Sequence, residues 1–298
     1  MTADALLARP SFLSRRGRLL TGVLIAAGLA WASLGLSPAD ALPGEAGRGI
    51  LSLFLEGALS PALTYQAAEV PVDAPPLLLR VVGALWQTLI FAAAGMSLSL
   101  VIGIVFGFLG ASSWWADEGS YAVRAHARSH APLVRLMPFV HVTVRVLIAL
   151  MRSVHELLWA VLFLAALGLS SFSAVIAIAI PYGGTLAKVF SEMLDECPRD
   201  AARSLRAIGV GGVGVFAWGL LPRALGDMSA YAFYRFECAV RSSAILGFFG
   251  YPTIGYYLRL SAENVHYREV WTYLYALLAL LGLLELWSSK LRQRVVMR

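Results

Sequence analysis

The chain has 298 residues, of which 59% are hydrophobic and only 14% are charged, whereas a soluble globular domain carries about 25% charged residues. So few charges cannot cover a water-facing surface, which excludes an ordinary soluble domain and indicates an integral membrane protein. The formal net charge of +6 is then explained by Lys and Arg held on the cytoplasmic side of a membrane, and we predict no nucleic-acid partner.

Six apolar segments are long enough to cross a membrane, because a hydrocarbon core of about 30 Å needs about 20 apolar residues in a helix. They predict an all-α, polytopic membrane protein with spans at residues 17–37, 82–110, 136–167, 172–192, 216–247 and 270–288. The third segment is the least regular, since Arg152, His155 and Glu156 interrupt its apolar run. We nevertheless assign one helix to 136–167, followed by an outer turn at 168–171.

Basic residues orient these spans, because Lys and Arg concentrate on the cytoplasmic side. The two tails and the loop after the second span contain Arg9, Arg15, Arg16, Arg18, Arg124, Arg128, Arg135, Lys290, Arg292, Arg294 and Arg298. The loop 38–80 is acidic instead, with Asp40, Glu45, Glu56, Glu69 and Asp73. Both termini and the polar segment 191–215 are therefore predicted to lie in the cytoplasm.

The first span has two interpretations, an uncleaved membrane anchor or a signal peptide. The sequence Ala39-Asp40-Ala41 resembles a cleavage site. The apolar stretch Leu19–Leu36 is longer than the usual 7–15 residues of a signal peptide. This length favours the anchor, and cleavage would leave the topology of the other spans unchanged.

A charged segment separates two of the apolar spans. Residues 198–209 suit a short helix, with Pro198 placed for its first turn and Gly209 where a helix would end. The following glycines predict a flexible turn before Trp218 and Pro222 begin the next membrane helix. A short charged helix between two spans indicates a surface offered to a cytosolic partner.

This segment resembles the cytosolic loop of binding-protein-dependent ABC importer permeases. The pattern of that family is Glu-Ala-Ala, three residues, Gly, nine residues, Ile, one residue and Leu-Pro. Three positions of this chain agree with it: Gly209, Leu221 and Pro222. Four positions depart from it: Arg203, Ser204 and Leu205 in place of Glu-Ala-Ala, and Gly219 in place of Ile.

Two further segments are similar to the phosphonate importer subfamily. Residues 152–160, Arg-Ser-Val-His-Glu-Leu-Leu-Trp-Ala, resemble its Arg-Ser-Ile-Pro-Glu-Leu-x-Trp-Ala segment. Residues 234–247 contain Tyr-Arg-Phe-Glu, Val-Arg-Ser and Ile-Leu-Gly, close to the Tyr-Arg-Phe-Glu, Val-Arg-Ser and Val-Leu-Gly of that subfamily. The resemblance assigns residues 82–292 to a permease domain, preceded by an N-terminal region, 1–81, and followed by a cytosolic tail, 293–298.

The resemblance implies a type I importer permease with the MetI-like fold, in a bacterial inner membrane. Two permease subunits, identical or different, would pair, and a periplasmic binding protein would deliver phosphonate or a related phosphorus oxyanion such as phosphite or hypophosphite. ATP and Mg²⁺ would bind the partner ATPase subunits, while this chain would hold no cofactor and would not be an enzyme. The implied ATPase-coupling residues are Arg203, Ser204, Leu205, Gly209, Leu221 and Pro222.

Charged residues inside the predicted spans need partners or a water-filled path, because each costs about 2.5–3.5 kcal/mol at mid-bilayer. The chain has five such residues: Arg152, Glu156, Arg235, Glu237 and Arg241. Two i,i+4 pairs are possible, Arg152 with Glu156 and Glu237 with Arg241. The remaining residue, Arg235, has no partner on its own helix and shares a face with Ser242.

We therefore predict an electropositive pathway for an anion, since arginine guanidinium groups suit phosphorus oxyanions. The candidate pathway residues are Arg152, Glu156, Tyr234, Arg235, Glu237, Arg241 and Ser242. Among these, Arg235 is the least compensated and is expected to meet the substrate or the other subunit. The alternative is that all these charges form ion pairs that only lock helices together.

Other functional classes have weaker support. A self-contained ion-coupled transporter could use His155 and Glu156 as a proton carrier. A membrane-embedded enzyme would need a nucleophile–base pair or a metal cluster, and the sequence shows neither. It also contains no Walker A sequence, so the chain is not expected to hydrolyse ATP itself. The segment Gly209–Gly214 satisfies G-x-G-x-x-G but lacks the strand that a dinucleotide site requires.

Metal and disulfide sites are not expected. His126 and His130 have a possible metal-ligand spacing, i,i+4, but no third ligand lies nearby in the sequence. Cys197 and Cys238 fall in a predicted cytosolic loop and a predicted span. We therefore predict no disulfide and no metal ion.

Overall fold

The computed structural model describes residues 15–35, 37, 44–67, 73–112 and 131–296, and every regular element in these ranges is a helix. The chain divides into two compact units, Met1–Leu55 and Glu56–Arg298. The all-α prediction is confirmed.

The first unit contains α1 (Arg15–Ser33) and most of α2 (Glu45–Leu59). The apolar side chains of α1, such as Leu19, Leu24 and Leu29, are exposed. A helix that exposes apolar side chains in this way is suited to lipid.

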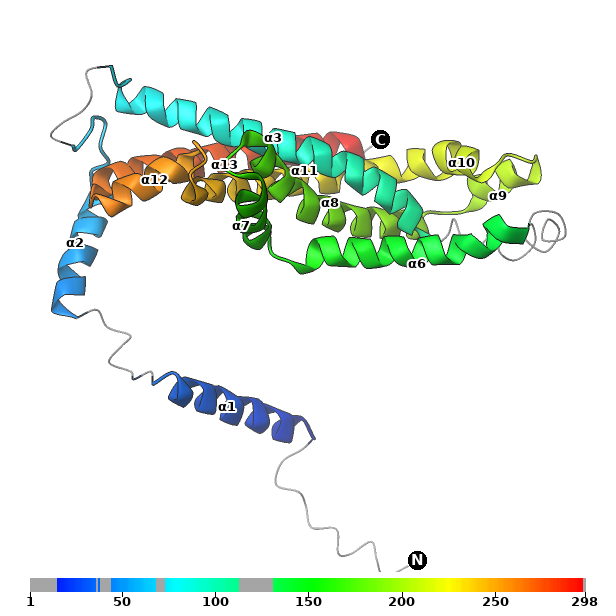
Figure 1. Cartoon of the computed structure of the whole chain (residues 1–298), viewed down its shortest axis with the longest axis horizontal. Coiled ribbons are helices and arrows are strands. Elements are labelled where there is room, and N and C mark those ends of the chain that lie inside the picture. Colours follow the sequence, from blue (N-terminus) through cyan, green and yellow to red (C-terminus); the bar gives the residue numbers. More distant parts are fainter. Residues whose placement is uncertain (1–14, 36, 38–43, 68–72, 113–130, 297–298) are drawn as a thin grey trace, which may run out of the picture. The chain divides into compact units, whose positions relative to one another are not determined.

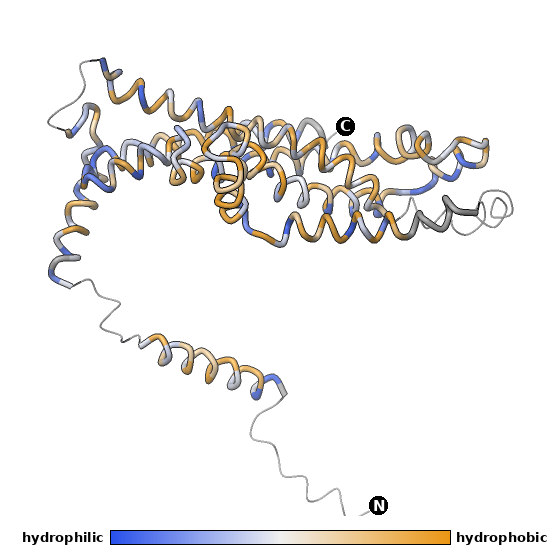
Figure 2. The backbone as a smooth tube through the Cα atoms, viewed as in Figure 1, coloured by the Kyte–Doolittle hydropathy of each residue, from blue (hydrophilic) through white to orange (hydrophobic). Residues whose placement is uncertain are grey.

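The second unit holds the remaining helices (Figure 1): α3 (Leu77–Gly110), α6 (Ala131–Ser153), α7 (Glu156–Leu167), α8 (Ser171–Glu196), α9 (Asp200–Ala207), α10 (Gly212–Val215), a π-helix (Phe216–Leu220), α11 (Leu221–Leu246), a 3₁₀ turn (Gly247–Phe249), α12 (Ile254–Glu263) and α13 (Tyr267–Val296). In this unit α9 lies at one end, next to α10. The other end is formed by α12 and the first turns of α3 and α13. Hydrophilic residues gather at α9, while α3 and α7 are mainly hydrophobic (Figure 2).

The centre of the second unit is α8, which contacts α3, α6, α7 and α11. Close packing with α3 depends on small residues, as is common between membrane helices. A Cβ added to Gly103 of α3 would lie 2.7 Å from Cβ of Leu186 on α8. The buried core of the unit therefore forms where α3 meets α8.

Three helices are long and apolar enough to cross a membrane: α3, α8 and residues Tyr267–Leu291 of α13. A fourth crossing is available if Phe139–Ser153 and Glu156–Leu167 form one bent span. The other two expected spans, 17–37 and 216–247, coincide with α1 and with the π-helix and α11. Five charged side chains distinguish α11 from the apolar spans: Arg223, Asp227, Arg235, Glu237 and Arg241.

The predicted single helix over 136–167 is wrong, because α6 and α7 meet at a bend of 93°. His155 has extended backbone angles, φ −63° and ψ 144°, and its ring accepts a hydrogen bond from the Leu157 amide at the start of α7. The side chain at the break thus caps a new helix, which ends the previous one. The apolar periodicity on both sides hid this local cap.

The predicted flexible glycine turn before Trp218 is also wrong. Residues from Gly212 onward are helical, and α10, the π-helix and α11 follow one another without an intervening loop. The helix α9 begins at Asp200, so Pro198 precedes it instead of occupying its first turn. The predicted end of this helix agrees with the structure, since Gly209 has a φ of +85°.

The segment after α2 packs with the second unit. The Ala62 amide donates to the Arg268 carbonyl at 3.0 Å, and the Thr272 hydroxyl donates to the Ala62 carbonyl at 2.6 Å. The Gln66 amide donates to the buried Glu269 carboxylate at 2.6 Å. This segment therefore belongs, by its contacts, with α13.

Candidate functional site

A polar pocket of about 430 Å³ lies where the α6–α7 break meets α8 and α11. Its polar and charged lining residues are Arg152, His155, Glu156, Tyr182, Thr185, Arg235, Arg241 and Ser242. We call it the basic pocket, because three arginines and one glutamate line it. Five of the predicted pathway residues meet here: Arg152, Glu156, Arg235, Arg241 and Ser242.

A chain of hydrogen bonds joins three helices across the basic pocket. The Ser242 hydroxyl on α11 donates to Glu156 Oε1 on α7 at 2.8 Å. The Tyr182 hydroxyl on α8 lies 2.8 Å from the same Ser242 oxygen. The Glu156 carboxylate is thereby held at the pocket wall.

The Arg235 guanidinium of the basic pocket has no carboxylate partner within salt-bridge distance among the described residues. Its Cζ lies 4.9 Å from the ring centre of Tyr182 and 5.9 Å from that of Tyr231, so two aromatic rings stabilise its charge. Its Nε is buried and has no hydrogen-bond partner. A buried donor without an acceptor is costly, so the fold holds this guanidinium at the pocket wall without its full set of acceptors.

The predicted ion pair between Glu237 and Arg241 is present, with 3.4 Å between Glu237 Oε1 and Arg241 Nη2. The Glu237 side chain is 14% exposed and does not line the basic pocket, whereas Arg241 does. The carboxylate of Glu237 therefore reduces the field of Arg241 from outside the cavity.

The predicted pair between Arg152 and Glu156 does not form. The i,i+4 geometry requires a continuous helix, and the break at His155 removes it. Glu156 instead accepts from Ser242 and lies 3.9 Å from His155 Nε2. Within the described part of the chain, Arg152 makes neither an ion pair nor a hydrogen bond and is left to face the cavity.

Two tyrosines lie differently from what the sequence predicted. Tyr234, a predicted pathway residue, is exposed and packs near Tyr231, with ring centres 6.1 Å apart, but does not line the pocket. The sequence analysis missed Tyr182, which supports Arg235 and bonds Ser242. The sequence feature that could have identified Tyr182 is a tyrosine hydroxyl directly after Pro181, inside an apolar span.

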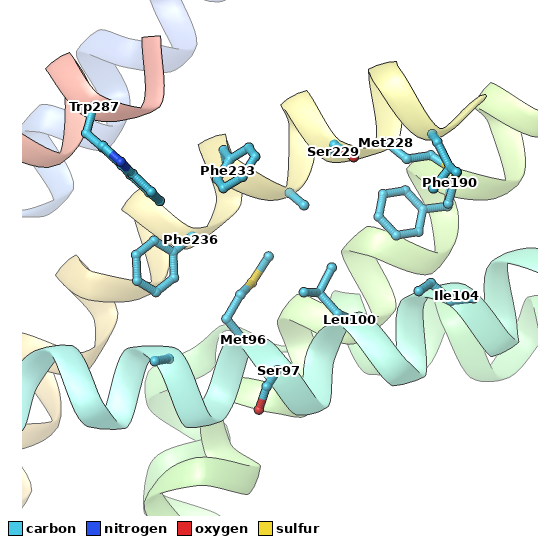
Figure 3. A pocket seen from close by; sticks show the side chains of 13 residues that line it. Met96, Ser97, Leu100, Ile104, Phe190, Met228, Ser229, Phe233, Phe236 and Trp287 are labelled. Atoms are coloured by element: carbon cyan, nitrogen blue, oxygen red, sulfur yellow. The ribbon is translucent and has the colours of Figure 1, made fainter. Parts of the chain in front are cut away.

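A second cavity has a similar size and the opposite chemistry (Figure 3). It measures about 450 Å³, and its lining side chains come from α3, α8, α11 and α13. Met96, Phe236 and Trp287 are among them, and the polar side chains in its lining are Ser97 and Ser229. Its described lining residues include no charged side chain, and we call it the apolar pocket.

The predicted coupling helix, α9, packs on the π-helix through one face. Ala202 is buried, and Leu205 is half-buried. A Cβ added to Gly219 would lie 3.2 Å from Leu205 Cδ1 and 3.4 Å from the Ala202 Cα. The absence of a side chain at Gly219, where the family pattern has Ile, therefore allows this close approach.

The Leu221-Pro222 dipeptide explains the π-helix. Proline has no amide hydrogen, and its ring clashes with the carbonyl four residues earlier, here that of Trp218. The Leu221 amide bonds the Phe216 carbonyl, five residues back, in a widened turn. Leu221 is half-buried and Pro222 is exposed.

The outer face of this region carries both charge and apolar surface. Arg203 and Ser204 are exposed on α9. Ile208 is 76% exposed and Trp218 is 79% exposed. The Arg223 guanidinium donates to the Pro198 carbonyl at 3.2 Å, which ties α11 to the start of the α9 segment.

Several other predicted features lie away from these sites. His126 and His130 lie outside the described residues. No group of three or more metal-ligand side chains occurs among the residues that the structure describes. Cys197 and Cys238 are free thiols, and burial raises the pKa of the Cys197 thiol.

A helical membrane unit with a basic cavity among its helices and a short charged helix at one end fits the membrane subunit of a transporter. Comparison with known proteins gives the particular family. Residues 103–295 match the family model "Binding-protein-dependent transport system inner membrane component", and the chain belongs to this family.

Two relatives and two solved structures illustrate the likeness. The phosphite transport system permease protein PtxC of Stutzerimonas stutzeri is 31% identical, over 70% of this chain and 68% of that protein. The phosphate-import permease protein PhnE of Mycolicibacterium smegmatis is 27% identical, over 70% of this chain and 35% of its own length. The inward-facing MetNI methionine ABC transporter gives a TM-score of 0.58 at 20% identity, over 74% of this chain and 99% of that chain. An amino acid ABC transporter gives a TM-score of 0.57 at 13% identity, over 73% of this chain and 94% of that chain. At these identities, both structural similarities concern the fold alone.

Proposed function

We propose that this chain is the membrane permease subunit of an ATP-driven importer for a small phosphorus oxyanion, either a phosphonate or phosphite. The observation that carries the proposal is the Arg235 guanidinium, which lines the basic cavity, is half-buried beside two tyrosine rings and has no carboxylate partner among the described residues. The names of the two relatives, which concern phosphite and phosphate transport, support the same substrate class.

The basic pocket can bind such an anion without trapping it. Arg235, Arg152 and Arg241 supply the guanidinium donors that suit tetrahedral oxyanions. Glu156 places one negative charge in the lining, and Glu237 places another behind Arg241. These carboxylates limit the affinity of the pocket, and a transport site must release its substrate.

The proposed partners follow from the exposed end of the second unit. An ATPase subunit would bind α9 and the exposed Ile208 and Trp218, and ATP with Mg²⁺ would bind to that subunit. A second permease subunit would complete the pathway, and a periplasmic binding protein would deliver the anion at the opposite end. The α9 end and both termini would then lie in the cytoplasm of a bacterium, and the chain would sit in the lipid of the inner membrane.

Reconstituted uptake tests this function. Proteoliposomes should contain this chain, its partner permease if there is one, and the ATPase and binding protein encoded with it. We expect ATP-dependent accumulation of phosphite or methylphosphonate, with sulfate as the control anion. Uptake that needs no ATPase and collapses with the proton gradient would favour the ion-coupled alternative.

Co-purification tests the coupling helix separately. A variant with Gly209→Pro and Leu205→Asp should lose the ATPase, because the first change disrupts a residue at positive φ and the second puts a charge against Gly219. Arg259→Gln on α12, at the other end of the unit, is the control and should retain the ATPase. Retention of the ATPase by the double variant, with the membrane fold intact, would reject α9 as the coupling helix.

A further inference from the structure

A second basic cavity lies along the seam between α6 and α8. It measures about 490 Å³, and we call it the seam pocket. Three cations and two serines line it: Arg145, Arg152, Lys188, Ser153 and Ser191. No carboxylate is among its described lining residues. Its formal charge therefore exceeds that of the basic pocket, which has a glutamate in its wall.

The seam pocket adjoins the basic pocket, since Arg152 lines both. On α8 the lining passes from Thr185 of the basic pocket to Lys188 of the seam pocket, an advance of about 4.5 Å along the helix at 1.5 Å per residue. This direction along α8 leads to its end at Glu196, where the chain continues into α9 (Figure 1). The two cavities therefore follow one another along α8, and the seam pocket is the one nearer to the α9 end.

Close packing fixes Arg152 at the border of the two cavities. A Cβ added to Gly184 of α8 would lie 2.6 Å from Cβ of Met151 and 3.2 Å from the Arg152 amide nitrogen. The last turn of α6 therefore rests directly on α8. The Arg152 side chain begins at this contact and makes no hydrogen bond or ion pair within the described structure.

The three cations of the seam pocket differ in how firmly they are held. Arg145 donates to the Gly110 carbonyl and to the Ser112 hydroxyl, both at 3.2 Å, and lies 4.0 Å from the Asp195 carboxylate. Lys188 forms an i,i+4 ion pair with Glu192, whose side chain is 51% exposed. Exposed ion pairs contribute little to stability, so an incoming anion can take Lys188 from Glu192 at little cost.

We propose that the seam pocket is a second anion-binding site, which receives the phosphorus oxyanion from the basic pocket through Arg152. The anion then moves from Arg152 to Lys188, with Glu192 as the competing partner that later displaces it. This inference rests on the proposed function. The phosphate headgroup of an anionic lipid has the same chemistry, and the membrane composition in the test separates the two sources.

Opposite charge changes in the Lys188–Glu192 pair test the proposal. The complex of permease, ATPase and binding protein in proteoliposomes is assayed for phosphite uptake, and the permease–ATPase complex in nanodiscs for equilibrium binding of radiolabelled phosphite. Lys188→Gln should lower kcat for uptake about tenfold with KM within about twofold, because the second site follows capture; such a factor is typical of one charged contact. Binding should fall from two phosphite ions per permease chain to one, and Lys188→Arg should restore both readouts.

Glu192→Gln should act in the opposite direction, since it removes the competing carboxylate and keeps the cation. We expect the second phosphite ion to bind about threefold to tenfold more tightly, a range that fits the loss of one nearby opposing charge. A matched ion pair on α12, Arg259 with Glu263, has similar exposure, lies at the other end of the unit and provides the control. Arg259→Gln and Glu263→Gln should leave the affinity for the second phosphite ion unchanged.

Two results would overturn the proposal. Equal effects of Lys188→Gln and Glu192→Gln, in size and sign, would mean that the pair only stabilises α8. If the effects of the Lys188 and Glu192 variants on phosphite uptake and binding occur with anionic lipid and vanish in purely zwitterionic membranes, the seam pocket binds a lipid headgroup instead.

The failure of this inference differs from failure of the proposed function. If the unmodified complex imports no phosphorus oxyanion, the function is wrong. If it imports one and depends on Arg235, while the Lys188 and Glu192 variants match the unmodified chain, only the second site is wrong.

Discussion

The basic pocket and the apolar pocket share α11 and differ little in volume, about 430 Å³ against about 450 Å³. Arg235 lines the first and Phe236, the next residue, lines the second. Successive residues of a helix point about 100° apart, so one helix separates a charged cavity from an uncharged one. The comparison teaches that the charge of the lining, and not the size of the cavity, identifies the candidate transport site.

The largest expected effect comes from Arg235→Gln, which would remove the charge that distinguishes the two cavities. We expect kcat/KM for uptake to fall about tenfold to a hundredfold, equivalent to the roughly 1.5–3 kcal/mol of a hydrogen bond to a charged group. Arg235→Lys keeps the charge but loses the planar fork, and should give an intermediate value. Normal uptake by Arg235→Gln would show that the charge of the lining does not identify the transport site.

The next effect comes from Glu156→Gln, which would sharpen the contrast by making the basic pocket more positive. The amide oxygen can still accept from Ser242, so the hydrogen-bond chain remains. We expect KM to fall about fivefold and kcat to fall as well, because release becomes slower when an opposing charge is lost. Uptake kinetics at fixed ionic strength measure both constants, and a raised KM would contradict the role given to this carboxylate.

A smaller effect is expected for Tyr182→Phe. The substitution removes the hydroxyl contact with Ser242 and keeps the ring beside Arg235. A neutral hydrogen bond contributes about 0.5–1.5 kcal/mol, and kcat/KM should fall about threefold. Tyr182→Leu, which also removes the ring, should be clearly worse; equal losses in the two variants would argue against the cation–π contact.

The smallest effect is expected in the apolar pocket. Met228→Leu conserves volume at a buried position, a change that costs less than about 1.5 kcal/mol. KM for the anion should stay within about twofold, while a thermal unfolding assay reports any loss of packing. A changed anion preference in this variant would show that the uncharged cavity also handles substrate.

Much of the site could be predicted from the sequence, because charges inside apolar spans need a physical reason to be there. This argument alone gathered Arg152, Arg235 and Arg241, which the structure brings to one cavity. It also paired Glu237 with Arg241 correctly, since that pair lies within one continuous helix.

The rest of the fold and of the site could not be predicted, because it depends on local helix caps and on packing between residues far apart in the sequence. The break before α7 comes from the His155 side chain, which a count of apolar residues does not register. The role of Tyr182 depends on how α8 packs against α11, 60 residues away at Ser242. Likewise, Gly219 departs from the family pattern for a reason that only the contact with α9 reveals. The exposed Arg203 at the usual acidic position has no explanation in the structure.

The π-helix at Phe216–Leu220 has a consequence for how this chain can vary. A π turn encloses one more residue in its hydrogen-bonded ring than an α turn, so it holds what amounts to a one-residue insertion in an otherwise continuous helix. Deleting one residue here would convert the π turn into an α turn and leave the helices on either side close to their present angular register. A deletion of one residue elsewhere in the helix would instead rotate the two sides by about 100° relative to each other, so a one-residue difference in the spacing between Gly209 and Leu221-Pro222 is expected to be tolerated at the π turn.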